Sequence, residues 1–286
     1  MPNKIDTVGV ISKPGSDLAV RVVPEVIAWL EARGMSVRLD PETAGYAKRD
    51  AVPRESVADG AQLVIVLGGD GTLLSAARAV GGRDIPLFAV NLGNLGFLTA
   101  IKVDEIYPQL ERVLKGEFQT GHRRMLHSEL WRGGQCIGTY EALNDMTLAK
   151  SEIARMIDFS VDVDDHQMCL YKADGLVIST PTGSTAYSLS AGGPVVFPTV
   201  AALCITPICP HSLTQRPVIV PDEAIIRINV VGASQTYLTA DGQVGQLLQP
   251  GDQVICRRSE KTVALIHQPD QKFFDVLREK LKWGGR

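Results

Sequence analysis

The chain has 286 residues, of which 45% are hydrophobic and 21% are charged. This composition is typical of a globular protein with one large core or two modest ones, and it excludes a disordered or low-complexity chain. The formal charge is −3 at pH 7, so no basic excess is available to attract nucleic acid or acidic lipid. We therefore expect two domains, and neither a nucleic-acid nor a membrane partner.

No segment predicts an export signal or a membrane span. The longest apolar stretch, 195–209, is interrupted by Pro198 and Pro207 and is shorter than the roughly 20 residues that a membrane helix needs. The N-terminus lacks the apolar run of a signal peptide. The five cysteines and five histidines are dispersed without zinc-binding spacing, so free thiols in a reducing compartment are expected. These features predict a cytoplasmic protein.

The first third of the chain alternates between strand and helix patterns. Strands are predicted at 7–12, 36–39, 62–67 and 87–90, and helices at 18–33, 73–80 and 103–114. The run 62–67 is continuously apolar, as is typical of a strand buried on both faces. Pro24 interrupts the first helix and predicts a kink or a later start. The alternation predicts an α/β domain over residues 1–121, with a parallel sheet covered by helices.

After about residue 121 the pattern changes to short strands separated by turn residues. The predicted strands 125–131 and 135–143 flank Arg-Gly-Gly, which indicates a β-hairpin. The strands are predicted at 125–131, 135–143, 156–163, 168–171, 176–179, 225–231, 235–239, 253–257 and 263–267. They indicate an all-β domain over residues 122–267, a sandwich or a distorted barrel.

A final amphipathic helix is predicted at 273–282. Phe274, Leu277 and Leu281 form its apolar stripe, which needs a surface to pack against. We expect this last helix to return to the first domain, so that residues 268–286 complete it.

The strongest local motif is Gly-Gly-Asp-Gly-Thr at 68–72, between a predicted buried strand and a predicted helix. Ligands of parallel α/β sheets bind beyond the carboxyl ends of the strands, and glycines let backbone N–H groups approach a phosphate. A carboxylate there is suited to bind Mg²⁺ or to accept a proton from a hydroxyl, although Asp70 could also simply cap the helix. The residues expected to form the phosphate loop are Gly68, Gly69, Gly71 and Thr72.

Three further segments carry polar or glycine-rich patterns. Asn-Leu-Gly-Asn-Leu-Gly-Phe-Leu-Thr at 91–99 follows another predicted strand and is expected to line one crevice with Asp70. Asn144 and Asp145 place an amide beside a carboxylate, which suits the base and ribose of an adenosine, or a plain polar turn. The segment 172–194 contains seven Ser and Thr hydroxyls and supplies many short donors and acceptors.

Together these segments resemble one family, the bacterial ATP-dependent NAD kinases, over nearly the whole chain. Gly-Gly-Asp-Gly-Thr alone is shared with phosphofructokinases and lipid kinases, but its combination with 91–99 and 172–194 is specific, and Pro-His-Ser-Leu at 210–213 adds to the match. The resemblance implies transfer of the ATP γ-phosphoryl group to the 2′-hydroxyl of the adenosine ribose of NAD, making NADP. It also implies a divalent metal ion, with Mg²⁺ expected, and self-association as a dimer or tetramer.

The resemblance implies roles for individual residues as well. Asp70 is expected to be the general base, and Asn144 and Asp145 to hold the adenosine, with Asp145 in place of the family's usual Glu. Asp174 is expected to contact NAD, in many members from a neighbouring subunit. The other predicted NAD contacts are Gly71, Phe97, Arg155, Lys172, Thr185, Ala186, Tyr187, Ser188, Leu189, Ser190 and Gln243. Of these, Lys172 stands where many relatives have Arg, and Arg155 where some have His.

Two other functions stay open at this point. One is a lipid or sugar kinase with the same Gly-Gly-Asp-Gly-Thr motif, against which the segment 180–187 argues. The other is a non-catalytic dinucleotide-binding regulator, against which the intact Asp70 argues. A ribose hydroxyl is a poor nucleophile, so a carboxylate within hydrogen-bond reach fits the kinase reaction. The residues that would hold the metal ion are left unassigned.

Overall fold

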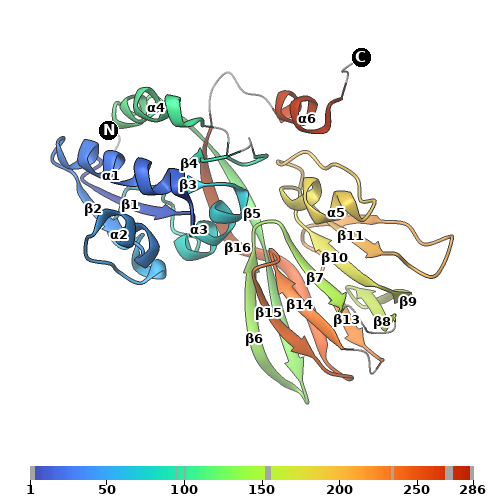
Figure 1. Cartoon of the computed structure of the whole chain (residues 1–286). Helices are drawn as coiled ribbons and strands as arrows, with labels where there is room; N and C mark the ends of the chain where they lie inside the picture. The colour runs from blue at the N-terminus through green and yellow to red at the C-terminus, as the bar shows by residue number, and fades with distance from the viewer. Residues whose placement is uncertain are drawn as a thin grey trace. The chain divides into compact units, whose positions relative to one another are not determined.

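The computed structural model of the chain describes residues 4–93, 96–99, 101–151, 156–232, 235–267 and 273–283. The chain divides into two compact units, which are drawn in Figure 1. The first unit comprises the chain up to His122 and again from Lys261, and the second comprises Arg123–Glu260. Two long strands, β5 (Gln119–Arg132) and β16 (Gln253–His267), contribute residues to both units.

The first unit is built on a parallel sheet, as predicted. Its strands are β1 (Thr7–Ser12), β2 (Ser36–Leu39), β3 (Leu63–Gly68) and β4 (Leu87–Asn91), in the order β2-β1-β3-β4. Leu265, near the end of β16, pairs in parallel with Leu87 of β4. Every residue of β3 and β4 is buried, because helices cover both faces of a sheet of this kind.

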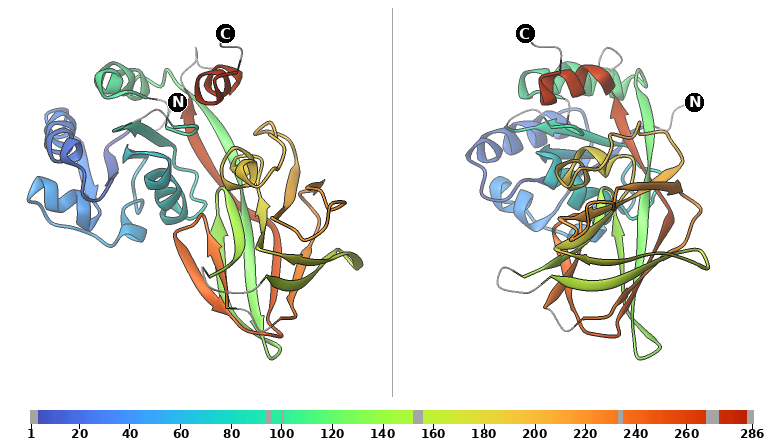
Figure 2. Two further views of the ribbon diagram at one scale, coloured as in Figure 1. Left: turned by 45° about the vertical axis from the view of Figure 1, so that its right-hand side comes forward. Right: turned by 90° about the vertical axis from the view of Figure 1, so that its right-hand side faces the viewer.

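Helices pack on the two faces of this sheet (Figures 1 and 2). They are α1 (Asp17–Glu31), α2 (Pro41–Ala47), α3 (Asp70–Val80), α4 (Ile106–Leu114) and α6 (Phe273–Leu281), with 3₁₀ turns η1 (Arg54–Ser56) and η2 (Val103–Glu105). Residues of α1 and α4 share one core cluster with alternate residues of β1, β3 and β4. On Gly9 of β1, a Cβ atom would lie 2.7 Å from Cγ1 of Val57, so the segment after η1 packs closely against the sheet.

Two expectations about helices need correction. α1 begins at Asp17, where Ser16 caps it, and not after Pro24. Pro24 lies on the exposed side, so the carbonyl group that loses its partner stays open to water. α6 belongs to the first unit, as expected, but Phe274 is 57% exposed while Val276 is buried beside Leu277. The Lys280 ammonium lies 5.9 Å from the centre of the Phe97 ring, so α6 reaches the loop after β4.

The second unit is an antiparallel β-sandwich. One sheet contains β7 (Asp145–Lys150), β10 (Gly175–Ser179), β11 (Ala202–Ile208), β12 (Val218–Pro221), β14 (Thr236–Ala240) and β15 (Val244–Leu248), in the order β12-β11-β10-β7-β14-β15. The opposing strands are β6 (Gln135–Ala142), β8 (Ile157–Val163), β9 (His166–Ala173) and β13 (Ile226–Val230), with parts of β5 and β16. Met146 and Leu148 share one core cluster with Phe159 and Ile228. This confirms the predicted all-β, sandwich-like fold class of the C-terminal part of the chain.

Several elements of the second unit are not predicted by the sequence pattern. β7, β11, β12, β15, a turn η3 (Gly183–Thr185) and the short helix α5 (Tyr187–Ser190) were missed, and so was α2 in the first unit. The two strands predicted at 253–257 and 263–267 are one strand, β16. Apart from the buried Ser259, the polar residues between them are exposed, so an outward-facing stretch was mistaken for a break. The second half of the apolar stretch 195–209 forms β11, a buried inner strand of the sheet.

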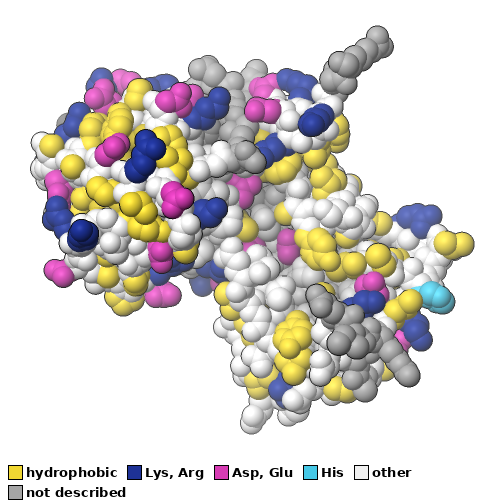
Figure 3. All heavy atoms as spheres, viewed as in Figure 1, with side chains coloured by type: hydrophobic (Ala, Val, Ile, Leu, Met, Phe, Trp, Pro, Cys, Tyr) yellow, Lys and Arg dark blue, Asp and Glu magenta, His cyan; other side chains and the backbone are white. Residues whose placement is uncertain are grey.

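The surface shows mixed charge. Figure 3 shows Lys and Arg side chains interspersed with Asp and Glu on the visible face of the first unit. None of the helices in the described part of the chain is long and apolar enough to cross a membrane.

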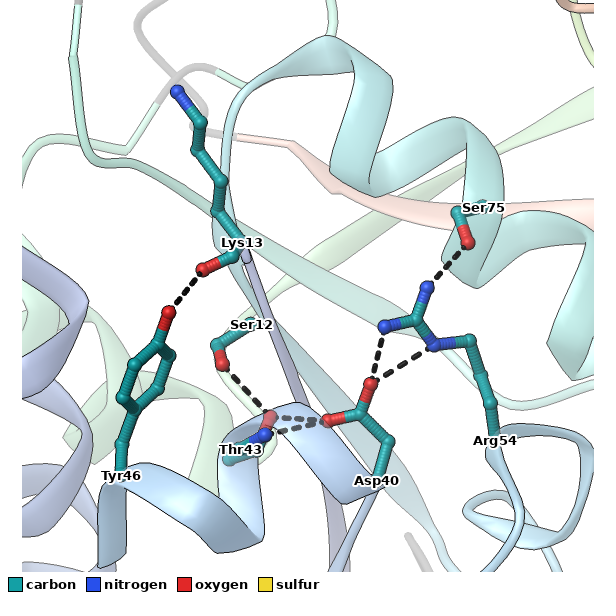
Figure 4. Close-up of polar contacts among 7 residues, drawn as sticks. All are labelled: Ser12, Lys13, Asp40, Thr43, Tyr46, Arg54 and Ser75. Carbon is teal, nitrogen blue, oxygen red and sulfur yellow. Dashed lines mark hydrogen bonds and ion pairs between the residues drawn. The ribbon is translucent and has the colours of Figure 1, made fainter. Parts of the chain in front are cut away.

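A buried polar network joins the carboxyl ends of β1 and β2 to helix α3 (Figure 4). Asp40, which is fully buried, caps α2 by accepting the Thr43 N–H at 3.0 Å. Its other oxygen accepts from Arg54 Nε at 2.8 Å, and Arg54 Nη1 donates to Ser75 Oγ of α3 at 2.8 Å. Thr43 Oγ1 also bonds to Ser12 Oγ at 2.9 Å. The network therefore ties η1 and α3 to the strand ends beside the Gly-Gly-Asp-Gly-Thr loop.

Candidate active site

Asp70 is the first residue of α3 and directly follows the carboxyl end of β3. Gly69 occupies the cap position, and Asp70 makes no cap hydrogen bond, which excludes the reading of Asp70 as a helix cap. Its carboxylate instead accepts from the loop after β4. Phe97 N donates to Oδ2 at 2.8 Å, and Leu98 N and Thr99 N donate to Oδ1 at 3.1 Å each. Thr99 Oγ1 adds a further bond to Oδ1 at 3.0 Å.

The two oxygens of Asp70 are therefore unequal. Oδ1 accepts three hydrogen bonds and Oδ2 accepts one. A carboxylate offers about four lone-pair sites over its two oxygens, so Oδ2 retains acceptor capacity after Oδ1 is filled. Asp70 is partly exposed, so part of the residue is accessible to a ligand.

Glycines allow the loop to close on Asp70. A Cβ on Gly96 would lie 1.9 Å from Asp70 Oδ1 and 2.4 Å from Thr99 Oγ1, so only a glycine fits there. A Cβ on Gly68 would lie 2.3 Å from Thr72 Oγ1, which shows how tightly β3 turns into α3. At Gly69, by contrast, no heavy atom of the described chain lies within 4 Å of a Cβ position, so a ligand can approach the backbone there.

In the second unit, Asn144 and Asp145 lie in a turn that is held by Asp241. The Asp241 carboxylate accepts the backbone N–H groups of Leu143 at 3.2 Å, Asn144 at 2.8 Å and Asp145 at 3.3 Å. Asp241 has a positive φ of 51° in the turn between β14 and β15. This role of Asp241 was not predicted from the sequence. The Asp-Gly pair at 241–242 signalled the turn, but nothing local signalled its partners, because they lie almost a hundred residues away.

Asn144 and Asp145 are both buried polar residues. Burial raises the pKa of Asp145 from its ordinary 3.8 to about 6, opposed by the hydrogen bond from Thr147 and assisted by the nearby Asp241 carboxylate. Asn144 Oδ1 is buried and has no hydrogen-bond partner among the residues that the structure describes. A buried polar atom without a partner costs about 1–3 kcal/mol, so a ligand donor at Asn144 would relieve that cost.

Asp145 and helix α5 lie on the same face of the six-stranded sheet. Asp145 pairs with Ser179, and Ser179 pairs with Cys204 on the next strand, so their side chains share a face. Ser188 of α5 is buried and bonds to Thr206 Oγ1 at 3.0 Å on that face. The predicted NAD contacts in the segment 172–194 therefore lie over the face of the sheet that carries the Asp145 side chain. They are Thr185, Ala186, Tyr187, Leu189 and Ser190, which are part-buried or exposed, whereas the Ser188 hydroxyl points into the sheet.

The structure does not bring Asp174 to the same place. Asp145 lies at the Ser179 end of the β7–β10 pair, whereas Gly175, next to Asp174, pairs with Ala149 at the other end. Four residues along a strand span about 13 Å. Asp174 makes an ion pair with Lys150, with Nζ and Oδ1 2.5 Å apart.

The remaining predicted contacts are spread over the second unit. Lys172 is exposed on β9, and Gln243 lies in the turn after Asp241. Arg155 lies outside the described residues. Within the part of the chain that is described, no group of three or more His, Cys, Asp or Glu side chains could hold a metal ion by itself.

Comparison with known proteins covers both units. The profile of the ATP-NAD kinase N-terminal domain matches residues 8–118, and that of the ATP-NAD kinase C-terminal domain matches residues 143–268. The NAD kinase of Solibacter usitatus is 55% identical over 284 residues, covering 99% of each chain. The NAD kinase of Geotalea daltonii is 46% identical over 286 residues, covering 98% of this chain and 99% of the relative.

Two solved structures are similar as well. The structure of yeast NADH kinase complexed with NADH matches with a TM-score of 0.91 at 27% identity, covering 99% of this chain and 89% of that one. The structure of an NAD kinase from Archaeoglobus fulgidus in complex with ATP matches with a TM-score of 0.75 at 25% identity, covering 96% of this chain and 98% of that one.

Both domain profiles and both solved structures are those of kinases, so the chain belongs to the phosphotransferases. The chain belongs to the ATP-NAD kinase family. It is an enzyme, an ATP:NAD 2′-phosphotransferase with ATP and NAD as substrates. The family membership decides against the lipid or sugar kinase and against the non-catalytic regulator.

Proposed function

We propose that Asp70 is the general base of this NAD kinase and that its Oδ2 accepts the proton of the ribose 2′-hydroxyl. The observation that carries the proposal is the unequal bonding of the carboxylate, in which Oδ1 accepts three hydrogen bonds and Oδ2 accepts one. As the proton moves to Oδ2, the 2′-oxygen attacks the γ-phosphorus of ATP. The bond from that phosphorus to the β–γ bridging oxygen breaks, and ADP leaves. Loop N–H groups near Gly69 would stabilise the phosphate charge.

A steady-state assay of NADP formation from ATP and NAD, with Mg²⁺ present, tests the overall reaction. Diacylglycerol offered in place of NAD is the control acceptor, since lipid kinases share the motif around Asp70. Phosphorylation of diacylglycerol without formation of NADP would contradict the proposal.

We expect Mg²⁺ to be bound mainly by the triphosphate of ATP and not by a cluster of protein side chains. Mg²⁺ in proteins usually keeps several waters and binds through one or two carboxylates together with substrate phosphates. That mode suits a chain whose described residues contain no three-ligand cluster. When bound, the ion would neutralise charge on the phosphates during transfer.

Asn144 and Asp145 would hold the adenosine of NAD. The buried Asn144 Oδ1 needs a donor, which the adenine amino group can supply. The Asp145 carboxylate, when ionised, accepts hydrogen bonds from ribose hydroxyls. The α5 segment, including Tyr187, borders the same face of the sheet, and the buried Ser188 bond to Thr206 would position that segment.

We expect Asp145→Asn to stabilise the protein at neutral pH while weakening NAD binding. An acid with a folded pKa of about 6 and an unfolded pKa near 3.8 binds more protons when folded, so stability falls as pH rises between these values. Removing the charge should therefore raise the free energy of unfolding on the order of 1–3 kcal/mol at pH 7.5, and by less at pH 5. Urea denaturation at both pH values measures this difference.

The same variant should raise KM for NAD at pH 7.5, because the amide offers the ribose fewer and weaker acceptor sites. In the wild-type enzyme, KM for NAD should fall between pH 5 and pH 7 as Asp145 ionises. A stability gain that is equal at both pH values, or an unchanged KM, would count against the assigned role of Asp145.

The enzyme is expected to act as a homo-oligomer with Asp174 serving a neighbouring subunit. Asp174 lies about 13 Å along the strands from Asp145, so it is badly placed for the same adenosine. The second unit also exposes apolar side chains, such as the paired Tyr237 and Leu247 on β14 and β15, and hydrophobic patches are visible on it in Figure 3. Such surfaces are typical of contacts between subunits.

Light scattering and subunit mixing test this prediction. A mass above the 30.9 kDa of one chain is expected for the active enzyme. Mixing Asp70→Asn with Asp174→Ala should give more activity than the sum of the two, because exchanged subunits build some sites without either lesion. A fully active species with the mass of one chain would refute the shared site.

A further inference from the structure

Behind the Asp70 carboxylate lies a buried chain of two polar side chains. Asn91, the last residue of β4, donates from Nδ2 to Thr99 Oγ1 at 2.8 Å. Thr99 Oγ1 in turn bonds to Asp70 Oδ1 at 3.0 Å. Both Asn91 and Thr99 are buried, so water does not compete for these bonds.

The direction of each bond in this chain is determined by chemistry. An amide NH₂ group can only donate, so the Thr99 hydroxyl accepts from Asn91 and its single proton goes to Asp70 Oδ1. Asn91 cannot turn its amide around, because its Oδ1 already accepts the Gly93 N–H at 2.7 Å. A reversed amide would set two donors against each other. The hydroxyl of Thr99 is therefore held in one orientation, and so is the oxygen of Asp70 that receives it.

We propose that Asn91 and Thr99 are positioning residues for the phosphoryl transfer. Through the Thr99 hydroxyl bond to Oδ1, which adds to the backbone N–H bonds of the loop, they hold the Asp70 carboxylate in the one rotation that presents Oδ2 to the substrate hydroxyl. This inference rests on the proposed role of Asp70 as the base. It goes beyond that role by naming which residues orient the base and through which oxygen.

Thr99→Val removes the hydroxyl and keeps the shape of the side chain. The three backbone N–H bonds to Asp70 remain, so the loop should stay closed. We expect kcat to fall about 10-fold or more, because small errors in orienting a reacting group are costly, while KM for NAD and for ATP stays within about two-fold. Thr99→Ser, which restores the hydroxyl, should recover most of kcat.

Asn91→Ala tests the second link of the chain. It leaves the Thr99 hydroxyl free to rotate, so it should also lower kcat with little change in KM. If Asn91 acts through Thr99, the double variant Asn91→Ala/Thr99→Val should be no slower than Thr99→Val alone. Asn91→Ala also carries the test if Thr99→Val does not fold.

Thr43→Val is the matched control, since Thr43 is another fully buried threonine of the same unit (Figure 4). Its hydroxyl bonds to Ser12 and Asp40 and not to Asp70. It should lower the melting temperature without changing kcat. If Thr99→Val behaves like Thr43→Val, losing stability at unchanged kcat, Thr99 is merely structural and the inference is overturned.

Asp70→Asn, assayed in parallel, separates this inference from the proposed function. If Asp70→Asn is inactive and Thr99→Val has wild-type kcat, the base assignment stands and the positioning role is wrong. If Asp70→Asn keeps wild-type kcat, the proposed base is wrong and the inference falls with it. Support requires an inactive Asp70→Asn together with a kcat defect in Thr99→Val that Thr99→Ser reverses.

Discussion

Asp70→Asn should lower kcat by about 10²–10⁴-fold, the usual contribution of a general base. The amide has nearly the shape of the carboxylate, but it cannot take the proton from the 2′-hydroxyl of NAD. KM for NAD should change much less, because the adenosine contacts are assigned to Asn144 and Asp145. Steady-state kinetics on the purified variant, with NAD binding measured by calorimetry, checks both quantities.

The variant also needs a folding control, because an amide has only one oxygen and cannot accept the hydrogen bonds that the loop donates to both carboxylate oxygens. If the amide oxygen keeps the three bonds of Oδ1, its NH₂ group faces the Phe97 N–H, which now donates to Oδ2. That conflict should cost about 1–3 kcal/mol of stability, visible as a lower melting temperature. A folded Asp70→Asn enzyme with near-wild-type kcat would exclude Asp70 as the base.

Gly183→Ala should have the largest effect in the second unit. A Cβ at this position would lie 2.1 Å from the backbone oxygen of Asn144, and backbone atoms cannot move aside as a flexible side chain can. The new methyl group must therefore displace the turn that carries Asn144 and Asp145. We expect a stability loss of about 1–3 kcal/mol from overpacking and a clear rise in KM for NAD. Thermal denaturation and steady-state kinetics measure the two effects.

Gly45→Ala is the control for this substitution. Gly45 lies within α2, and no heavy atom of the described chain lies within 4 Å of its Cβ position. Alanine is a better helix former than glycine, so this variant should be as stable as wild type or more so, with unchanged KM. If Gly183→Ala matched Gly45→Ala in melting temperature and KM, the close approach of Gly183 to Asn144 would not matter for NAD binding.

The strands of the first unit could be predicted well from the sequence. The predictions for β1 and β2 match the observed bounds, and that for β3 is shifted by one residue. Buried parallel strands are continuous apolar runs between turn residues, so their signal is local. α5 gave no such signal, because it is only four residues long and Ser188 is held by its bond to Thr206 of another strand.

The candidate site was predictable in part for the same reason. The Gly-Gly-Asp-Gly-Thr motif identified Asp70 because the chemistry of a phosphate loop needs those residue types in sequence order. The partners that hold Asp70 come from 97–99, and the carboxylate that holds Asn144 is Asp241. Neither of these two pairings can be predicted from a fixed spacing in the sequence. Each depends on which strand ends lie side by side in the folded chain.

By itself the sequence determined the α/β and all-β organisation and the family, because these depend on local apolar periodicity and on contiguous motifs. Only the tertiary structure decided which oxygen of Asp70 accepts fewer hydrogen bonds, because that depends on donors contributed by the loop after β4. It also decided that Asp145 has a raised pKa, since burial and the neighbouring Asp241 arise only when β7 and β14 pair. Hydrogen bonds and desolvation join residues that are distant in the chain, and a linear pattern does not record them.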